Sequence, residues 1–229
     1  MDQSLAHNWK EPGFAAQWDT LADQVNPVRR EQLDLLLALL RAHNPATVLD
    51  VGVGSGLVAE MVLDTLPEAR VIGVDASPAM LALAGDRLSR FSGRARLVEA
   101  DLEDVVLAEC LDGPVEAAIS VQTLHNLEPG AHRRALASIG DAVAPGALFV
   151  NADRYAVPLD LFGVFRVVWD RVGADEGATP EEHTEKLQAQ GDRPVFLETE
   201  LSWLRESGFE AVCLQCLGNR AVVLGRRRR

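Results

Sequence analysis

The stretch VLDVGVGSG, residues 48–56, constrains the fold more than any other part of the sequence. Apolar residues lead into Asp50, and Gly52, Gly54 and Gly56 follow at every second position. A glycine-rich turn between a strand and a helix lets a ligand approach the backbone closely, and the helix N-terminus favours anions. The stretch therefore predicts a buried strand that ends at a ligand-binding turn.

The segments after this turn alternate between strand and helix patterns. Strands are predicted at TVLDV, RVIGVD, RARLVEAD, EAAISV and ALFVNAD, with helices between them. Ser77 and Pro78 form a helix-start signal, and Pro145-Gly146 should end the helix from about Glu128 to Val143. FEAVCLQCL and RAVVLGR flank Gly218-Asn219 and should form a hairpin. We expect an α/β fold, a doubly wound seven-stranded sheet that is parallel except for its antiparallel last strand.

The segments outside this alternation suggest how one domain, residues 1–229, is organised. Residues 1–26 carry scattered aromatic residues and are expected to form a helical N-terminal lid. Residues 27–154 are expected to form the ligand-binding core, and 155–195 a helical insertion that caps it. Residues 196–229 supply the terminal helix and hairpin.

The charge of the chain excludes some partners. The net charge is −12 and the sequence pI about 4.8, whereas proteins that grip nucleic-acid phosphates normally show a basic face. We therefore expect no nucleic-acid partner, and we interpret the tail Arg226–Arg229 as a solvated end. No apolar run reaches eighteen residues and no secretory signal is visible, so we expect no membrane span and a cytoplasmic location.

Three cysteines are present, and two of them form the motif CLQC at Cys213 and Cys216. On a regular strand, positions i and i+3 point to opposite faces. These two sulfurs are therefore expected to be buried separately instead of sharing a metal, and neither a metal site nor a disulfide framework is predicted.

Three acids follow successive predicted strands at the edge where open α/β sheets bind ligands. Leu57 occupies the position of the third glycine in a dinucleotide-binding turn, and Asp50 would repel a pyrophosphate but suit a ligand with an ammonium and a sulfonium. The two oxygens of Asp75 are placed to accept from both hydroxyls of an adenosine ribose. Asp101 and Leu102 offer an acceptor for an exocyclic amine and an apolar wall.

These residues resemble the class I S-adenosylmethionine-dependent methyltransferases. VLDVGVGSG matches that family's first motif, VIGVD with ASPAML the second, LVEADLED the third and AAISVQTLHNL the fourth-strand motif. PGALFV and the terminal hairpin fit as well. The resemblance covers residues 27–154 and 196–226 and implies the Rossmann-like methyltransferase fold with S-adenosylmethionine (SAM) as cofactor.

The resemblance also implies residue roles. The backbone around Gly52 and Gly54 would bind the methionine part of SAM, and Asp75 the ribose. The predicted cofactor-binding residues are Asp50, Gly52, Gly54, Gly56, Asp75, Ala76, Met80, Asp101, Leu102 and Ser120.

The acceptor side is less defined, because the cofactor's methyl group is already activated and the protein mainly aligns a nucleophile. His125 follows the fourth strand and is the candidate general base; a loop residue that shapes the pocket is the alternative. The predicted acceptor pocket comprises Trp9, Phe14, Trp18, Asp153, Arg154, Tyr155, Phe162 and Trp169, although aromatic residues at helical spacing are more often core. SVQTL replaces the family's asparagine-proline-proline-tyrosine motif, which argues against methylation of nucleic-acid amines or protein glutamine.

The sequence thus predicts methyl transfer from SAM to a small-molecule acceptor, with O- or N-methylation favoured and C-methylation open. A protein of the same fold that binds the cofactor without methylating is the alternative. An NAD-dependent oxidoreductase is disfavoured by Leu57 and the terminal hairpin. The sequence leaves a homodimer open.

Overall fold

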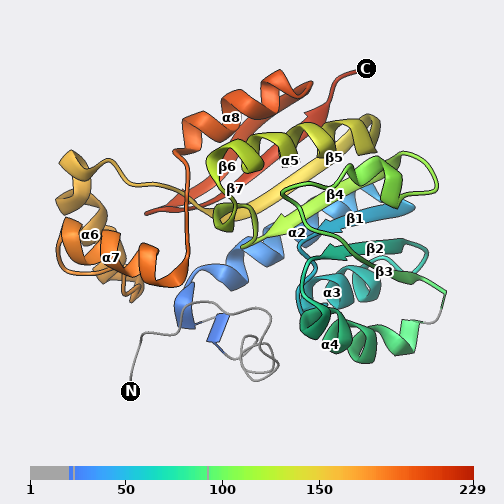
Figure 1. The fold of residues 1–229 in the computed structure, drawn as a ribbon, viewed down its shortest axis with the longest axis horizontal. Coiled ribbons are helices and arrows are strands. Elements are labelled where there is room, and N and C mark those ends of the chain that lie inside the picture. Colours follow the sequence, from blue (N-terminus) through green and yellow to red (C-terminus); the bar gives the residue numbers. More distant parts are fainter. Residues whose placement is uncertain (1–20, 23, 92) are drawn as a thin grey trace.

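The computed structural model describes residues 21–22, 24–91 and 93–229, and its centre is a twisted seven-stranded sheet (Figure 1). The strand order is β3-β2-β1-β4-β5-β7-β6. Strands β1 to β5 pair in parallel, and β7 pairs antiparallel with both β5 and β6, which confirms the predicted sheet. The strands are β1 (Thr47–Val51), β2 (Arg70–Asp75), β3 (Ala95–Glu99), β4 (Val115–Val121), β5 (Val143–Arg154), β6 (Phe209–Leu217) and β7 (Arg220–Arg227).

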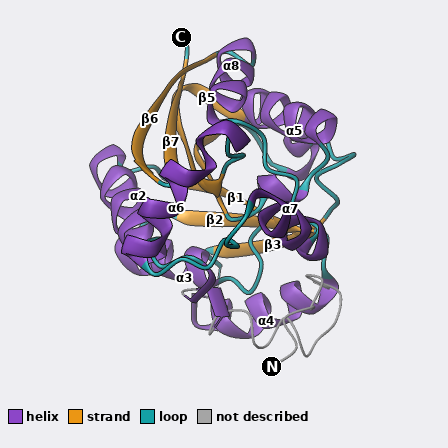
Figure 2. Ribbon diagram, turned by 90° about the vertical axis from the view of Figure 1, so that its left-hand side faces the viewer, coloured by secondary structure: helices purple, strands orange, loops and turns teal. Residues whose placement is uncertain are grey.

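Helices cover both faces of the sheet (Figures 1 and 2). One apolar core lies under α2, α3 and α4, and a second lies under α5 and α8. Because the central strands are buried on both sides, they appear in the sequence as nearly continuous apolar runs. The α-helices are α2 (Arg29–His43), α3 (Leu57–Thr65), α4 (Pro78–Leu88), α5 (Pro129–Ala142), α6 (Phe162–Val172), α7 (Pro180–Gln190) and α8 (Leu197–Glu206), and short 3₁₀ turns are η1 (Ser89–Phe91), η2 (Leu107–Cys110), η3 (Leu124–Asn126) and η4 (Leu159–Leu161).

Local signals place the helix ends. The Ser77 hydroxyl accepts a hydrogen bond from the Met80 amide at 3.2 Å, and Pro78 is the first residue of α4, as predicted. The predicted helix from about Glu128 to Val143 is also confirmed: α5 ends at Ala142, three residues before Pro145, and Val143 is already extended and pairs with Val115 across a bulge.

A bulge in β6 overturns the prediction for the CLQC motif. Cys213 pairs with Val223 and Gln215 pairs with Val222, so Leu214 is an extra residue in the strand. Cys216 then pairs with Ala221, which puts both cysteines on the same face. Cys213 is partly buried and Cys216 is exposed, so the expected separate burial is wrong as well.

The insertion after β5 folds as α6 and α7 beyond the carboxyl end of that strand (Figure 1). Phe162 and Trp169 belong to its own small apolar cluster, and the ring of His183 stacks on Trp169. Buried ion pairs from Arg154 to Glu176 and Asp192 fasten the insertion to β5.

None of the described helices is both long and apolar enough to cross a membrane. Trp9, Phe14 and Trp18, with most of the predicted lid, lie outside the described residues.

Candidate active site

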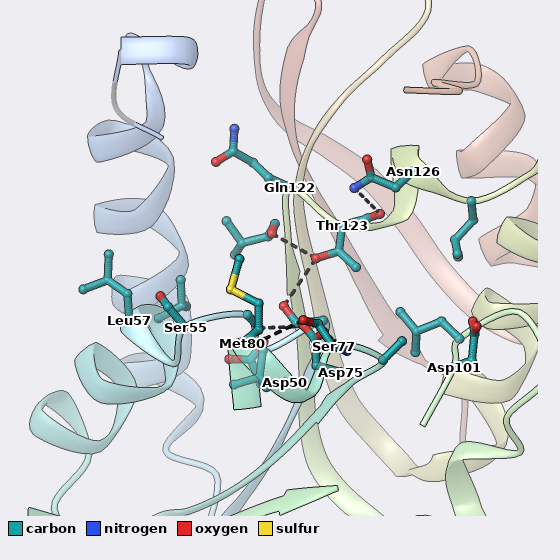
Figure 3. Close-up of a pocket in the computed structure, with 18 of the residues that line it drawn as sticks. Asp50, Ser55, Leu57, Asp75, Ser77, Met80, Asp101, Gln122, Thr123 and Asn126 are labelled. Carbon is teal, nitrogen blue, oxygen red and sulfur yellow. Dashed lines mark hydrogen bonds between the residues drawn. The ribbon is translucent and has the colours of Figure 1, made fainter. Parts of the chain in front are cut away.

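A cavity of about 310 Å³ opens at the carboxyl ends of β1, β2 and β4 (Figure 3). It contains most of the predicted cofactor residues, and only Gly56 and Ser120 of that group lie outside its wall. Its lining residues are Arg29, Asp50, Gly52, Val53, Gly54, Ser55, Leu57, Val58, Asp75, Ala76, Ser77, Met80, Asp101, Leu102, Val121, Gln122, Thr123, Asn126 and Leu127.

The glycine turn forms the floor of this cavity. The amides of Gly52 and Val53 both donate to the Val74 carbonyl, at 2.8 and 3.0 Å, which fastens the turn to the neighbouring strand. Gly52 has φ +78°, and a Cβ there would lie 2.2 Å from the Thr123 side chain. Only glycine combines this backbone conformation with such close packing against the β4 loop.

Asp75, at the end of β2, closes the turn from the other side. Its Oδ2 accepts from the Gly54 amide at 2.8 Å, and its Oδ1 accepts from the Ser77 amide at 2.9 Å. Burial raises the pKa of this carboxyl, and the backbone amides of Ser77, Gly54 and Ala76 oppose that shift. Each carboxylate oxygen keeps a further lone pair, so Asp75 is held rigidly and still accepts from a ligand.

Asp50 lies deeper in the same wall and is only 2% exposed. Within the described part of the chain, its Oδ2 has no hydrogen-bond partner. Burial, with repulsion from Asp75, raises the pKa of Asp50 from 3.8 to about 7. A buried carboxylate without a partner is costly, so this site favours a ligand that brings a donor or a positive charge.

The far end of the cavity suits a flat ring. The side chain of Asp101 lies on the side away from Ser55 and Leu57 (Figure 3). The carboxylate of Asp101 is exposed and accepts from the Glu103 amide at 3.0 Å. Leu102 is buried beside it and supplies an apolar surface. This end thus offers a polar acceptor beside an apolar wall.

The sequence reasoning missed the polar residues of the β4 loop and Arg29. Gln122 has φ +52°, a left-handed backbone conformation that residues other than glycine rarely adopt. Its Oε1 accepts from Nε of Arg29, which is 6% exposed, at 3.2 Å. Thr123 and Asn126 extend this polar wall. Arg29 lies in a segment whose sequence pattern indicates only a helix, and a positive φ leaves no signal at a glutamine.

His125 does not line the cavity. It is 6% exposed, and its ring lies between two carboxylates: Nδ1 bonds Asp153, and Nε2 is 3.6 Å from Asp192 Oδ1. Its carbonyl accepts from the Arg193 amide. This arrangement turns the ring away from any ligand in the cavity and ties the β4 loop to the end of the insertion. The geometry therefore favours the predicted alternative, a residue that shapes the pocket.

The described members of the predicted acceptor pocket are also elsewhere. Asp153 contacts the His125 ring, and Arg154 forms a buried ion pair with Asp192. The Tyr155 hydroxyl donates to Glu200 Oε1 at 2.9 Å. Phe162 and Trp169 fill the core of the insertion. All five are buried outside the cavity wall because the strand end and the insertion pack against each other.

The described residues contain no group of three or more histidine, cysteine or acidic side chains placed to hold a metal ion.

Comparison with known proteins agrees with this geometry. Residues 48–146, from β1 to the start of β5, match the family described as "Methyltransferase domain". This match covers less than half of the chain and identifies a methyltransferase domain within it. The fold of the chain matches a solved O-methyltransferase family protein from Burkholderia thailandensis with TM-score 0.69 and 17% identity, over 92% of this chain and 59% of that one.

Two curated relatives are also methyltransferases. Demethylmenaquinone methyltransferase from Thermus thermophilus is 32% identical over 145 residues, 63% of this chain and 62% of that protein. Release factor glutamine methyltransferase from Geobacter sulfurreducens is 46% identical over 65 residues, 28% of this chain and 23% of that protein. The chain therefore spans less than two thirds of either relative, and the acceptors that their names state differ.

Proposed function

We propose that the protein transfers a methyl group from SAM to a small-molecule acceptor. The observation that carries the proposal is the pair of buried carboxylates around the glycine turn. Asp50 Oδ2 lacks a donor within the described residues, and Asp75 presents a fixed acceptor at the next strand end, 21 positions after Gly54. A pyrophosphate beside these two charges would be repelled, whereas a ligand with an ammonium and a ribose would be attracted.

The cavity residues fit each part of SAM. Asp50 would bind the ammonium of the methionine part, and the buried guanidinium of Arg29 would bind its carboxylate. Asp75 would accept from the ribose hydroxyls, and Asp101 from the adenine amine with Leu102 against the ring. Bound SAM would supply a methyl group on a positively charged sulfur, ready for displacement by a nucleophile.

The protein's own contribution would be alignment and exclusion of water. The polar groups of Gln122, Thr123 and Asn126 line the cavity above Asp75 and Met80 in the view of Figure 3, where they would orient an acceptor. No histidine lines the cavity among the described residues, so an acceptor that is already nucleophilic, such as an amine or an acidic hydroxyl, suits the site best. His125 would act indirectly, by holding the loop that carries these groups.

A small acceptor is supported by the charge of the chain. With a net charge of −12, the protein lacks the excess of cations that binds nucleic-acid phosphates. The β4 loop and α4 both contribute to the cavity wall, and a cavity of about 310 Å³ suits a compact ligand better than a polymer.

Isothermal titration calorimetry with S-adenosylhomocysteine (SAH) and NAD tests the cofactor. We expect SAH to bind, Asp75→Asn to weaken it, and the matched control Asp86→Asn, an exposed acid on α4, to leave it unchanged. Binding of NAD in place of SAH would refute the proposal.

Methyl transfer is tested separately, by following SAH release with a panel of amines, phenols and carboxylic acids. Turnover of any member supports the proposal. SAH binding without turnover across the panel would favour a protein that binds the cofactor but does not methylate.

A further inference from the structure

The CLQC motif on β6 presents two thiols on one face of the sheet. The bulge at Leu214 gives Cys213 and Cys216 the partners Val223 and Ala221, which share a face of β7. Gln215, between them, points to the other face, since its amide donates to Glu31 on α2 at 3.3 Å. Two independent observations, the register and this contact, thus agree on the direction of both sulfurs.

The bulge also brings the two cysteines closer together. On a regular strand, residues i and i+3 are about 10 Å apart along the chain. Here the two cysteines lie opposite residues only two positions apart, which corresponds to about 7 Å. Cα atoms joined by a disulfide are usually about 4.4–6.8 Å apart, so a small adjustment at the bulge suffices.

The surroundings of the thiols differ in a useful way. Cys216 is exposed and Cys213 is partly buried. Burial raises the pKa of both thiols, and the nearby Cys216 raises that of Cys213 further. A raised pKa lowers the fraction of thiolate at neutral pH, so the pair would react slowly, under sustained oxidation, and not as a rapid sensor.

We propose that Cys213 and Cys216 are a modification site that forms a reversible disulfide within β6 when a hydroperoxide is present. The Cys216 thiolate attacks the peroxide O–O bond, forms a sulfenic acid and releases hydroxide or an alkoxide. The Cys213 thiol then displaces water from that sulfenic acid as the S–S bond forms. Two thiols are oxidised by two electrons, and one peroxide is reduced. A low-molecular-weight thiol reverses the step by exchange.

The disulfide would change the turn that follows. The Cys216 thiol faces the Gly218 carbonyl at 3.6 Å, and oxidation removes the proton of this contact. The same turn holds the insertion, because Trp169 donates to the Asn219 side chain at 3.1 Å and the Tyr155 amide donates to the Asn219 carbonyl at 2.8 Å. Oxidation of the thiol pair would therefore alter the turn against which α6 packs.

Alkylation and mass spectrometry of the full chain test the proposal, with Cys110 as an internal control. After hydrogen peroxide treatment, we expect neither Cys213 nor Cys216 to be alkylated, while Cys110 still is. The peptide that contains both cysteines should be about 2 Da lighter than its reduced, unalkylated form. Dithiothreitol should restore both thiols, and Cys110→Ser should behave as the unmodified protein.

The single variants separate a pair from two independent thiols. In Cys213→Ser, Cys216 should proceed to sulfenic and sulfinic acid, because its resolving partner is gone. The proposal fails if the unmodified protein also accumulates sulfinic acid at Cys216 while Cys213 stays alkylated, or if the disulfide formed joins Cys110 or two chains.

Discussion

The buried carboxyl of Asp50 predicts that cofactor binding depends strongly on pH near neutrality. With a pKa of about 7, Asp50 is largely protonated at pH 6 and ionised at pH 8. If the ammonium of the ligand binds only the ionised form, the apparent affinity falls as the carboxyl takes up a proton. The binding constant for SAH should therefore weaken by about tenfold from pH 8 to pH 6.

The same carboxyl predicts the pH dependence of stability without ligand. Below about pH 4, both the folded and the unfolded chain hold the proton, and above about pH 7 neither does. Between these values only the folded chain keeps it, because its pKa is raised. The stability that Asp50 contributes is therefore lost as the pH rises, by about 4 kcal/mol over this window.

Calorimetry at several pH values measures the first effect, and urea unfolding measures the second. Asp50→Asn removes the titrating group and keeps its size, so its SAH affinity should be lower at pH 8 and nearly the same at pH 6 and pH 8. In buffers of different ionisation enthalpy, the unmodified protein should release about 0.9 proton per SAH bound at pH 6 and about 0.1 at pH 8.

Two results would refute this reasoning. The first is an SAH affinity of the unmodified protein that changes less than twofold between pH 6 and pH 8. The second is an Asp50→Asn variant with the same pH slope as the unmodified protein, which would assign the titration to another group.

Three further predictions use other parts of the structure. Asp75→Ala should weaken SAH binding by about 1–3 kcal/mol in calorimetry, because it removes charged hydrogen bonds; unchanged affinity would remove this residue from the site. In urea unfolding, Gly52→Ala should lower stability more than Gly54→Ala, because the new Cβ at Gly52 meets the Thr123 side chain, whereas the one at Gly54 meets no protein atom within 4 Å and adds only a backbone strain of about 1–3 kcal/mol. Equal losses in the two glycine variants would contradict the packing argument. Arg154→Met should lower the free energy of unfolding by about 3–5 kcal/mol, since it removes the buried guanidinium that pairs with both Glu176 and Asp192, even though Arg220 still pairs with Glu176; a loss below 1 kcal/mol would show that the ion pairs do not hold the insertion.

Much of the fold follows from local chemistry that the sequence displays. The alternation of strands and helices, the Ser77-Pro78 helix start and the Gly218-Asn219 hairpin each depend on neighbouring residues, so they are visible without the structure. The acids Asp50 and Asp75 were found for the same reason: they end strands, and parallel strands end at a common edge.

The predictions that were wrong or missing concern residues whose positions depend on contacts between distant segments. His125 follows a strand as the acids do, but two carboxylates from β5 and the insertion turn its ring away from the cavity. Arg29 reaches the cavity because α2 packs against the sheet, which its helical pattern does not reveal. The bulge at Leu214 reverses the face of Cys216, and one extra residue leaves no mark in an apolar run.

The position of β7 between β5 and β6 has a consequence for assembly. Within the sheet, β6 hydrogen bonds only β7, although it precedes β7 in the chain. During synthesis β6 thus leaves the ribosome before the strand with which it pairs, and β5 keeps an unpaired edge. Both strands form their hydrogen bonds only when β7 inserts between them. The ribosome must therefore deliver the last strand before this half of the sheet can close, and any nascent chain halted after β6 would expose two unpaired strands to aggregation.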